Sequence, residues 1–156
     1  MKIDLRQEFF DTMEELAEKD KDIIVIVGDL GFSKMEKYQK RFPEQFLNAG
    51  CIEQSMVGIS TGMSLMGKKP YVYSGTIFLL MRAYEQIRDD ICYNNTNVKL
   101  IGTGASPFLG FSHNLQGMEN EEDLLKNLPN IKRFYPQNKE ELKEALLVEG
   151  PVFIKI

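Results

Sequence analysis

The sequence of 156 residues is poor in several residue types that carry chemistry: it has one histidine, two cysteines and no tryptophan. Cys51 and Cys92 are far apart in the chain, so they neither form a disulfide framework nor have the spacing of zinc ligands. We therefore expect no metal site built by this chain. Because the cysteines form no disulfide framework, a reducing cytoplasm is the expected location.

An excess of charge and long apolar runs are also missing. Lys and Arg total 19 against 23 Asp and Glu, which gives a net charge of -4, whereas a nucleic-acid-binding domain normally carries a basic face. No apolar run reaches the roughly 18 residues that a membrane span needs. The chain turns polar directly after Met1, without the apolar core of a signal peptide. We expect neither nucleic acid nor a membrane as a partner.

What the sequence does have is the composition and rhythm of an α/β domain. Hydrophobic residues make up 43% and charged residues 27%, as in ordinary globular domains, and the length predicts one domain over residues 1–156. Helices are expected over 4–18, 35–42, 53–66, 78–93, 121–127 and 139–148, and strands over 23–27, 46–48, 71–73, 98–101, 131–135 and 151–156. Asp4 is the expected N-cap of the first helix.

The strand over residues 23–27 is a run of Ile and Val without polar alternation, which is typical of a parallel strand covered on both faces. The pattern predicts a three-layer α/β/α fold with a mostly parallel, twisted sheet. Ligands of such folds bind at the carboxyl ends of strands. The loops after Val27, Asn48, Tyr73 and Ile101 are therefore the candidate site loops.

Glu53 stands where the loop after the strand at 46–48 meets a helix rich in small residues. One interpretation is a first-turn acid stabilised by the helix dipole, worth ~0.3–1 kcal/mol. The alternative starts from its neighbours Ile52, Met56, Val57 and Ile59, among which a bare carboxylate would be costly. Such an acid would meet a ligand that shares its proton.

The remaining candidates lie in loops and at a strand–helix junction. His113 is the single imidazole and lies in a long loop, where function concentrates, although a lone histidine is often structural. Phe78, Tyr73, Met81 and Tyr84 lie around one strand-to-helix junction, either as core residues or as a ring that stacks on a flat heterocycle. Residues 28–31 (GDLG) match no phosphate-binding motif and indicate a tight turn.

Several segments together resemble the pyrimidine-binding domain of the transketolase family of thiamine diphosphate enzymes, over essentially the whole chain. They are FPEQFLNAGCIEQ at residues 42–54, GKKPYVYS at 67–74, MRAYEQIR at 81–88 and GPVFIKI at 150–156. The resemblance implies the thiamine diphosphate-binding fold of the pyrimidine-binding type and a role in transferring two-carbon ketol units.

The resemblance also implies roles for single residues. Glu53 matches the glutamate that hydrogen-bonds the pyrimidine nitrogen N1′ and activates the cofactor. Phe78 matches the aromatic residue that stacks on the aminopyrimidine, and Tyr73 and Arg82 fall near that ring. His113 matches a catalytic histidine that lines the channel to the reacting carbon.

The chain departs from the family at two places. Leu109 stands where relatives often have an aspartate that contacts donor hydroxyls. Together with Phe108 and Phe111 it indicates a more apolar or differently shaped substrate channel. No Gly-Asp-Gly motif with a downstream asparagine is present to hold Mg²⁺ and the diphosphate. We therefore expect a separate diphosphate-binding subunit that holds the Mg²⁺, in an α2β2 assembly.

Three functions stay open at this point. The first is the pyrimidine-binding subunit of a two-chain transketolase-like enzyme acting on a small sugar. The second is a subunit of a 2-oxoacid decarboxylase of the sulfopyruvate or phosphonopyruvate type. The third is a non-catalytic assembly subunit, against which the retention of Glu53 argues.

Overall fold

The computed structural model describes residues 3–104 and 121–156, and its centre is a sheet of six strands in the order β2-β1-β3-β4-β6-β5. All five strand pairs are parallel. The strands are β1 (Ile23–Val27), β2 (Phe46–Asn48), β3 (Lys69–Gly75), β4 (Lys99–Thr103), β5 (Lys132–Phe134) and β6 (Val152–Lys155). Because every pair is parallel, all strands end at the same edge of the sheet.

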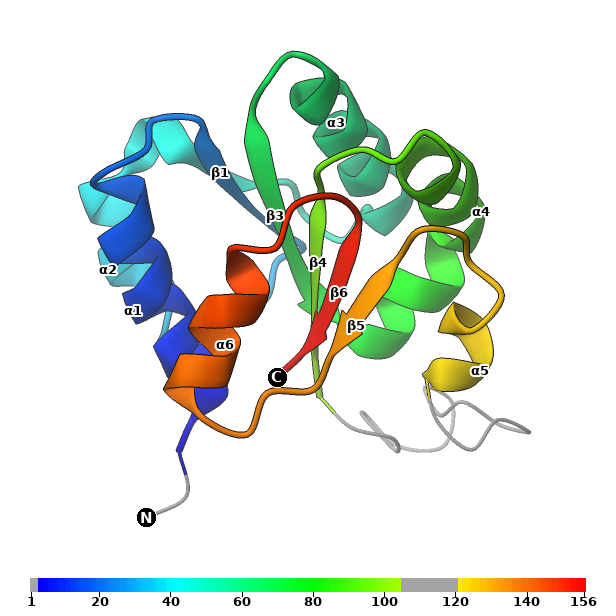
Figure 1. Cartoon of the computed structure of the whole chain (residues 1–156). Helices are drawn as coiled ribbons and strands as arrows, with labels where there is room; N and C mark the ends of the chain where they lie inside the picture. The colour runs from blue at the N-terminus through cyan, green and yellow to red at the C-terminus, as the bar shows by residue number, and fades with distance from the viewer. Residues whose placement is uncertain (1–2, 105–120) are drawn as a thin grey trace.

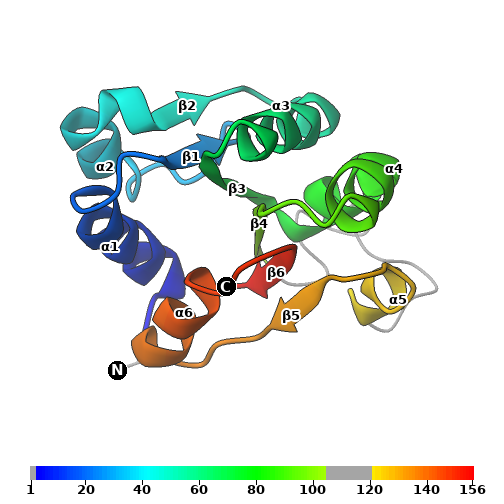
Figure 2. The same cartoon turned by 45° about the horizontal axis from the view of Figure 1, so that its top comes forward.

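Helices cover both faces of this sheet (Figures 1 and 2). One layer contains α1 (Leu5–Ala17), α2 (Glu36–Arg41) and α6 (Lys139–Leu146). The other contains α3 (Glu53–Leu65), the helical stretch around α4 (Tyr84–Gln86), and α5 (Glu122–Leu125). The predicted three-layer α/β/α fold is confirmed.

The β1 strand shows why its sequence lacks polar alternation. Val25 and Val27 belong to the core cluster under α1 and α6, whereas Ile26 belongs to the cluster under α3 and α4. All three side chains are fully buried. A central parallel strand is apolar on both faces because helices cover both.

Most predicted elements lie within a few residues of their expected bounds, and Asp4 caps α1 by accepting a hydrogen bond from the backbone N–H of Arg6. The β3 strand is longer than the expected 71–73 because it pairs along its length with β1 and β4, from Lys69 opposite Ile23 to Gly75 opposite Thr103. The length of β3 therefore depends on its neighbouring strands, and the sequence of β3 alone does not predict it.

The expected helix over 78–93 has a different geometry. Two π-helical segments, η2 (Phe78–Arg82) and η3 (Ile87–Tyr93), flank the single turn of α4. π-Helical turns are rare and occur frequently at functional sites. The wider turn begins directly after the carboxyl end of β3, so it shapes the site edge of the sheet.

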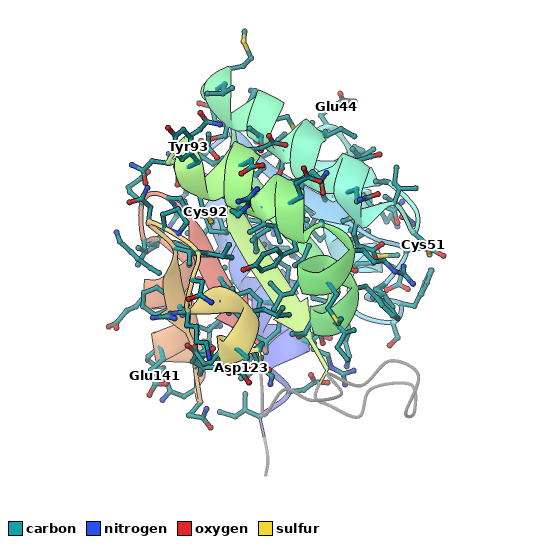
Figure 3. The ribbon with its side chains drawn as sticks, turned by 90° about the vertical axis from the view of Figure 1, so that its right-hand side faces the viewer. Glu44, Cys51, Cys92, Tyr93, Asp123 and Glu141 are labelled. Atoms are coloured by element: carbon teal, nitrogen blue, oxygen red, sulfur yellow. The ribbon has the colours of Figure 1, made fainter. Side chains whose placement is uncertain are left out.

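The two cysteines are free: Cys51 is exposed in the loop before α3, and Cys92 is buried in η3 (Figure 3). Across residues 3–104 and 121–156, none of the helices combines the length and the apolar character that a membrane span requires.

Candidate functional site

Glu53 is the first residue of α3, and only 2% of its surface is exposed. It follows the short β2 strand through the loop at residues 49–52, and the N–H of Ala49 donates to the carbonyl of Val27 in β1. The helix N-terminus favours a negative charge at this position. Burial nevertheless requires partners for both carboxylate oxygens.

Two side chains from other elements supply those partners. The Ser74 hydroxyl, on β3, donates a 3.0 Å hydrogen bond to Oε1 of Glu53. The Arg82 guanidinium, at the end of η2, donates a 3.1 Å hydrogen bond from Nη1 to Oε2. The carboxylate is therefore fixed between the sheet and the π-helical turn.

Phe78 and Arg82 form the second contact of the site. The guanidinium carbon of Arg82 lies 4.3 Å from the centre of the Phe78 ring, well within the range of a cation–π interaction. The two residues are four apart in the π-helical segment η2, which brings them to the same side. Arg82 thus joins Glu53 and Phe78 in one cluster.

A cavity of about 450 Å³ opens over this cluster. Its lining residues come from the start of α3 and from η2, namely Cys51, Ile52, Glu53, Gln54, Ser55 and Arg82. Figure 3 looks onto the layer of α3 and α4 and labels Cys51, which lies in the loop before α3 and is one of the residues that line this cavity. A buried carboxylate that lines a cavity, with an aromatic ring close by under Arg82, suits a flat ligand with a ring nitrogen.

The turn at residues 28–31 supports the site from behind. A Cβ atom on Gly28 would lie 3.0 Å from Oγ of Ser74 and 3.1 Å from Sδ of Met56. Asp29, with φ 54°, is joined to Asn48 by two hydrogen bonds of 3.2 Å. The chain bends at Gly28 and Asp29. Gly28 leaves space for the Ser74 side chain, and the hydrogen bonds of Asp29 to Asn48 hold the start of the loop that leads to Glu53.

The structure does not bring Tyr73 into this cluster. Its ring is 1% exposed and stacks on Phe9 of α1 at 5.5 Å, in the core cluster on the opposite side of the sheet from α3. Burial raises the pKa of its hydroxyl. It lines a different cavity, of about 820 Å³, with Arg6 and Lys34. Successive strand residues face opposite layers, so Ser74 reaches Glu53 and Tyr73 points away.

Ser74 is the site residue that the sequence analysis missed. A serine after an aromatic strand residue carries no chemical signal of its own, and its partner Glu53 is 21 positions earlier. The only available signal was the alternation of β3, which places Ser74 on the face opposite Tyr73.

His113 and the residues Phe108, Leu109 and Phe111 lie outside the described residues. Among the residues that the structure describes, no three His, Cys, Asp or Glu side chains gather in an arrangement that would hold a metal ion.

Comparison with known proteins gives the same family from sequence and from structure. Residues 1–149 match the family model described as transketolase, pyrimidine binding domain. An apulose-4-phosphate transketolase subunit from Actinobacillus succinogenes is 35% identical over 144 residues, which cover 86% of this chain and 45% of that protein. A 6-deoxy-6-sulfo-D-fructose transketolase subunit, SqwH, from a Clostridium species is 29% identical, over 97% of this chain and 49% of that protein.

Among solved structures, a split-gene transketolase described as an inactive beta4 tetramer superimposes with a TM-score of 0.82 and 34% identity. The match covers 96% of this chain and 49% of that chain. The chain thus spans about half the length of these relatives.

Proposed function

The chain belongs to the transketolase pyrimidine-binding domain family, and we propose that it is the pyrimidine-binding part of a two-chain, thiamine diphosphate-dependent transketolase-like enzyme. The observation that carries this proposal is the buried Glu53 carboxylate, which lines a cavity together with Arg82, while the Arg82 guanidinium stacks on Phe78. A non-catalytic assembly subunit would have no need to bury a carboxylate at such a place.

The described residues fit one half of the cofactor. Glu53 offers a carboxylate to a ring nitrogen, and Phe78 offers a ring face to an aminopyrimidine. In residues 3–104 and 121–156 no three His, Cys, Asp or Glu side chains gather in an arrangement that would hold a metal ion. We propose that a separate diphosphate-binding subunit holds the Mg²⁺ and the diphosphate.

When bound, thiamine diphosphate supplies the carbanion chemistry that carries a ketol unit. Glu53 holds a proton at the pyrimidine ring nitrogen, and its position at the start of α3 keeps that proton away from bulk water. Ser74 orients the carboxylate through its hydrogen bond to Oε1. Phe78 holds the plane of the ring. His113 is the proposed second catalytic residue.

The proposed assembly is an α2β2 heterotetramer. Two relatives are subunits of transketolases by their names, and a third, built from one kind of subunit, is described as an inactive beta4 tetramer. An inactive complex of one subunit type supports the requirement for a second type. We propose the same requirement for this chain.

A sugar-derived ketose is the proposed donor substrate. The names of the two relatives specify apulose-4-phosphate and 6-deoxy-6-sulfo-D-fructose, which are both sugar derivatives. These names favour ketol transfer over the decarboxylation of 2-oxoacids.

The test is reconstitution of the chain with a diphosphate-binding transketolase subunit, thiamine diphosphate and Mg²⁺. Transfer of a two-carbon unit from a ketose donor to an aldose acceptor, lost when either subunit is left out, is the expected result. If the complex released carbon dioxide from 2-oxoacids and transferred no two-carbon unit to an aldose, the chain would be a subunit of a 2-oxoacid decarboxylase instead. Full transfer activity with Glu53→Ala would assign the site elsewhere.

A further inference from the structure

The Arg82 guanidinium makes two contacts at once in the free chain. It donates to Oε2 of Glu53 at 3.1 Å, and it lies over the ring of Phe78 at 4.3 Å. Both contacts come from one planar group that carries N–H donors at its edge and stacks on aromatic faces. Arg82 thereby covers the carboxylate and the ring at the same time.

Under the proposed function, on which this inference rests, an aminopyrimidine needs the same two partners. A ring nitrogen faces the Glu53 carboxylate, and the ring plane stacks on Phe78. We propose that Arg82 is an internal substitute for the aminopyrimidine: its guanidinium occupies the cofactor position in the free chain and moves out when the cofactor enters.

The exposure of the two partners supports such an exchange. The Arg82 side chain is 48% exposed, whereas that of Glu53 is 2% exposed, so the guanidinium lies between the carboxylate and solvent. Arg82 is also a lining residue of the 450 Å³ cavity. An outward rotation of this side chain uncovers Glu53 and Phe78 without a change in the core.

The exchange also explains how the free chain tolerates its buried acid. A buried carboxylate without a counterion is costly, and in the free chain Arg82 and Ser74 compensate both oxygens. The entering ring stacks on Phe78 in place of Arg82. Its ring nitrogen is a hydrogen-bond acceptor, so Glu53 takes up one proton from solvent as Arg82 leaves and donates it to that nitrogen. In a closed chain the Arg82 guanidinium covers Glu53, and the cofactor binds only to open chains. The apparent affinity is therefore the intrinsic affinity multiplied by the fraction of chains that are open.

Thiamine is the suitable probe, because it carries the aminopyrimidine without the diphosphate. Its binding to the purified full chain is measured by NMR titration for wild type, Arg82→Ala and the control Arg88→Ala. Arg88 lies six positions later and pairs with its neighbour Asp89 at 3.2 Å, outside the site.

Arg82→Ala should bind thiamine at least about tenfold more tightly than wild type, the gain expected if about a tenth of the free chains are open. Arg88→Ala should bind like wild type. Added guanidinium ion should compete with thiamine in Arg82→Ala, because it refills the vacated position. Equal or weaker binding by Arg82→Ala would overturn the inference, since Arg82 would then assist the ring rather than replace it.

Two further variants keep the test decisive. Arg82→Lys retains a cation for Glu53 but removes the guanidinium plane that stacks on Phe78. It covers the case in which Arg82→Ala does not fold, and it should bind thiamine more tightly than wild type. In the double variant Arg82→Ala/Glu53→Gln the gain should disappear. A gain that persists would place the ring away from Glu53 and refute the exchange.

Failure of this inference is separable from failure of the proposed function. If the reconstituted enzyme transfers ketol units in a Glu53-dependent way while Arg82→Ala does not tighten thiamine binding, only the exchange is refuted. If Arg82→Ala tightens thiamine binding but no reconstituted complex transfers ketol units, the exchange stands and the proposed activity fails.

Discussion

The Ser74 hydroxyl and Oε1 of Glu53 lie 3.0 Å apart, and this hydrogen bond joins the third strand of the sheet to the first turn of α3. Ser74 is fully buried, and Gly28 provides the space beside its Oγ. The direction of the Glu53 carboxylate is therefore set by the sheet as well as by the half-exposed end of Arg82.

Replacing Ser74 by alanine should destabilise the chain by ~1–3 kcal/mol, because it leaves a buried carboxylate oxygen without its donor. The free energy of unfolding in urea measures this. Ser60→Ala is the matched control: Ser60 is also fully buried, but its hydroxyl donates only to the Val57 carbonyl of its own helix. We expect a smaller loss there, and equal losses would show that Glu53 does not need Ser74.

Glu53→Gln should lower the turnover of the reconstituted enzyme by ~10²–10⁴-fold, the usual loss when a general acid–base group is removed. The amide oxygen still accepts hydrogen bonds, so the thermal unfolding of the chain should change little. The exposed Glu44, in the short 3-10 helix η1 (Pro43–Gln45; Figure 3), provides the control Glu44→Gln, which should keep full turnover. Wild-type turnover in Glu53→Gln would remove this residue from the mechanism.

Phe78→Ala should weaken the affinity for thiamine diphosphate more than it slows turnover at saturating cofactor. The stacking surface contributes to binding, with aromatic pairs worth ~0.5–1.5 kcal/mol beyond burial, while the proton chemistry stays with Glu53. Activity titrated against cofactor concentration separates the two effects. Tyr93→Ala, at a ring that is 78% exposed, is the control. Unchanged activity at low cofactor would contradict the stacking role.

The sequence was sufficient for the layers of the fold. The uninterrupted run at residues 23–27 predicted a strand covered on both faces, and the structure buries Val25, Ile26 and Val27 in two separate clusters. Glu53 stood out as a carboxylate at a strand–helix junction inside an apolar stretch, but this pattern also fits a first-turn acid, and its proposed role comes from the family resemblance. Both signals are local in the chain.

The contacts around Glu53 were not predictable from such signals. A strand buried on both faces lacks the polar alternation that would tell which residues face which layer, so Tyr73 and Ser74 were not distinguished. The π-helical geometry of η2 has no single-residue signature, and it is this segment that brings Arg82 over Phe78. These relationships arise only when β3, η2 and α3 pack together.

Gly102→Ala should destabilise the chain by ~1–3 kcal/mol through overpacking. An added Cβ at this β4 position would lie 2.8 Å from Oγ1 of Thr76 and 2.9 Å from Cε2 of Phe153, which is fully buried. Gly58→Ala is the opposite case, because Gly58 lies in α3 and an added Cβ there would have no atom within 4 Å. There we expect a gain of ~0.5–1 kcal/mol from helix propensity. The free energy of unfolding in urea, measured for both variants, tests these two expectations. If Gly102→Ala were as stable as wild type, the close packing of Thr76 and Phe153 against Gly102 would be contradicted.

Lys99, the first residue of β4, is 2% exposed, and its Nζ contacts Oδ1 of Asn97 and lies 5.8 Å from the centre of the Tyr71 ring. Burial disfavours the charged form and lowers the pKa of Lys99 from 10.5 to about 8, despite the opposing charge of Glu149. Between these two pH values the unfolded chain binds a proton that the folded chain does not. Stability attributable to this group therefore rises as the pH increases from about 8 to 10.5.

Lys99→Met should thus stabilise the chain at pH 7 by about 2–3 kcal/mol, since the variant no longer buries a charge. The difference between the variant and wild type should shrink as the pH rises through this window, where the wild-type amine becomes neutral. Urea unfolding at several pH values measures it, with Lys40→Met, at an exposed position of α2, as a control that shows no such trend. A variant that is less stable than wild type at pH 7 would show that the Asn97 and Tyr71 contacts outweigh the cost of burying the ammonium group.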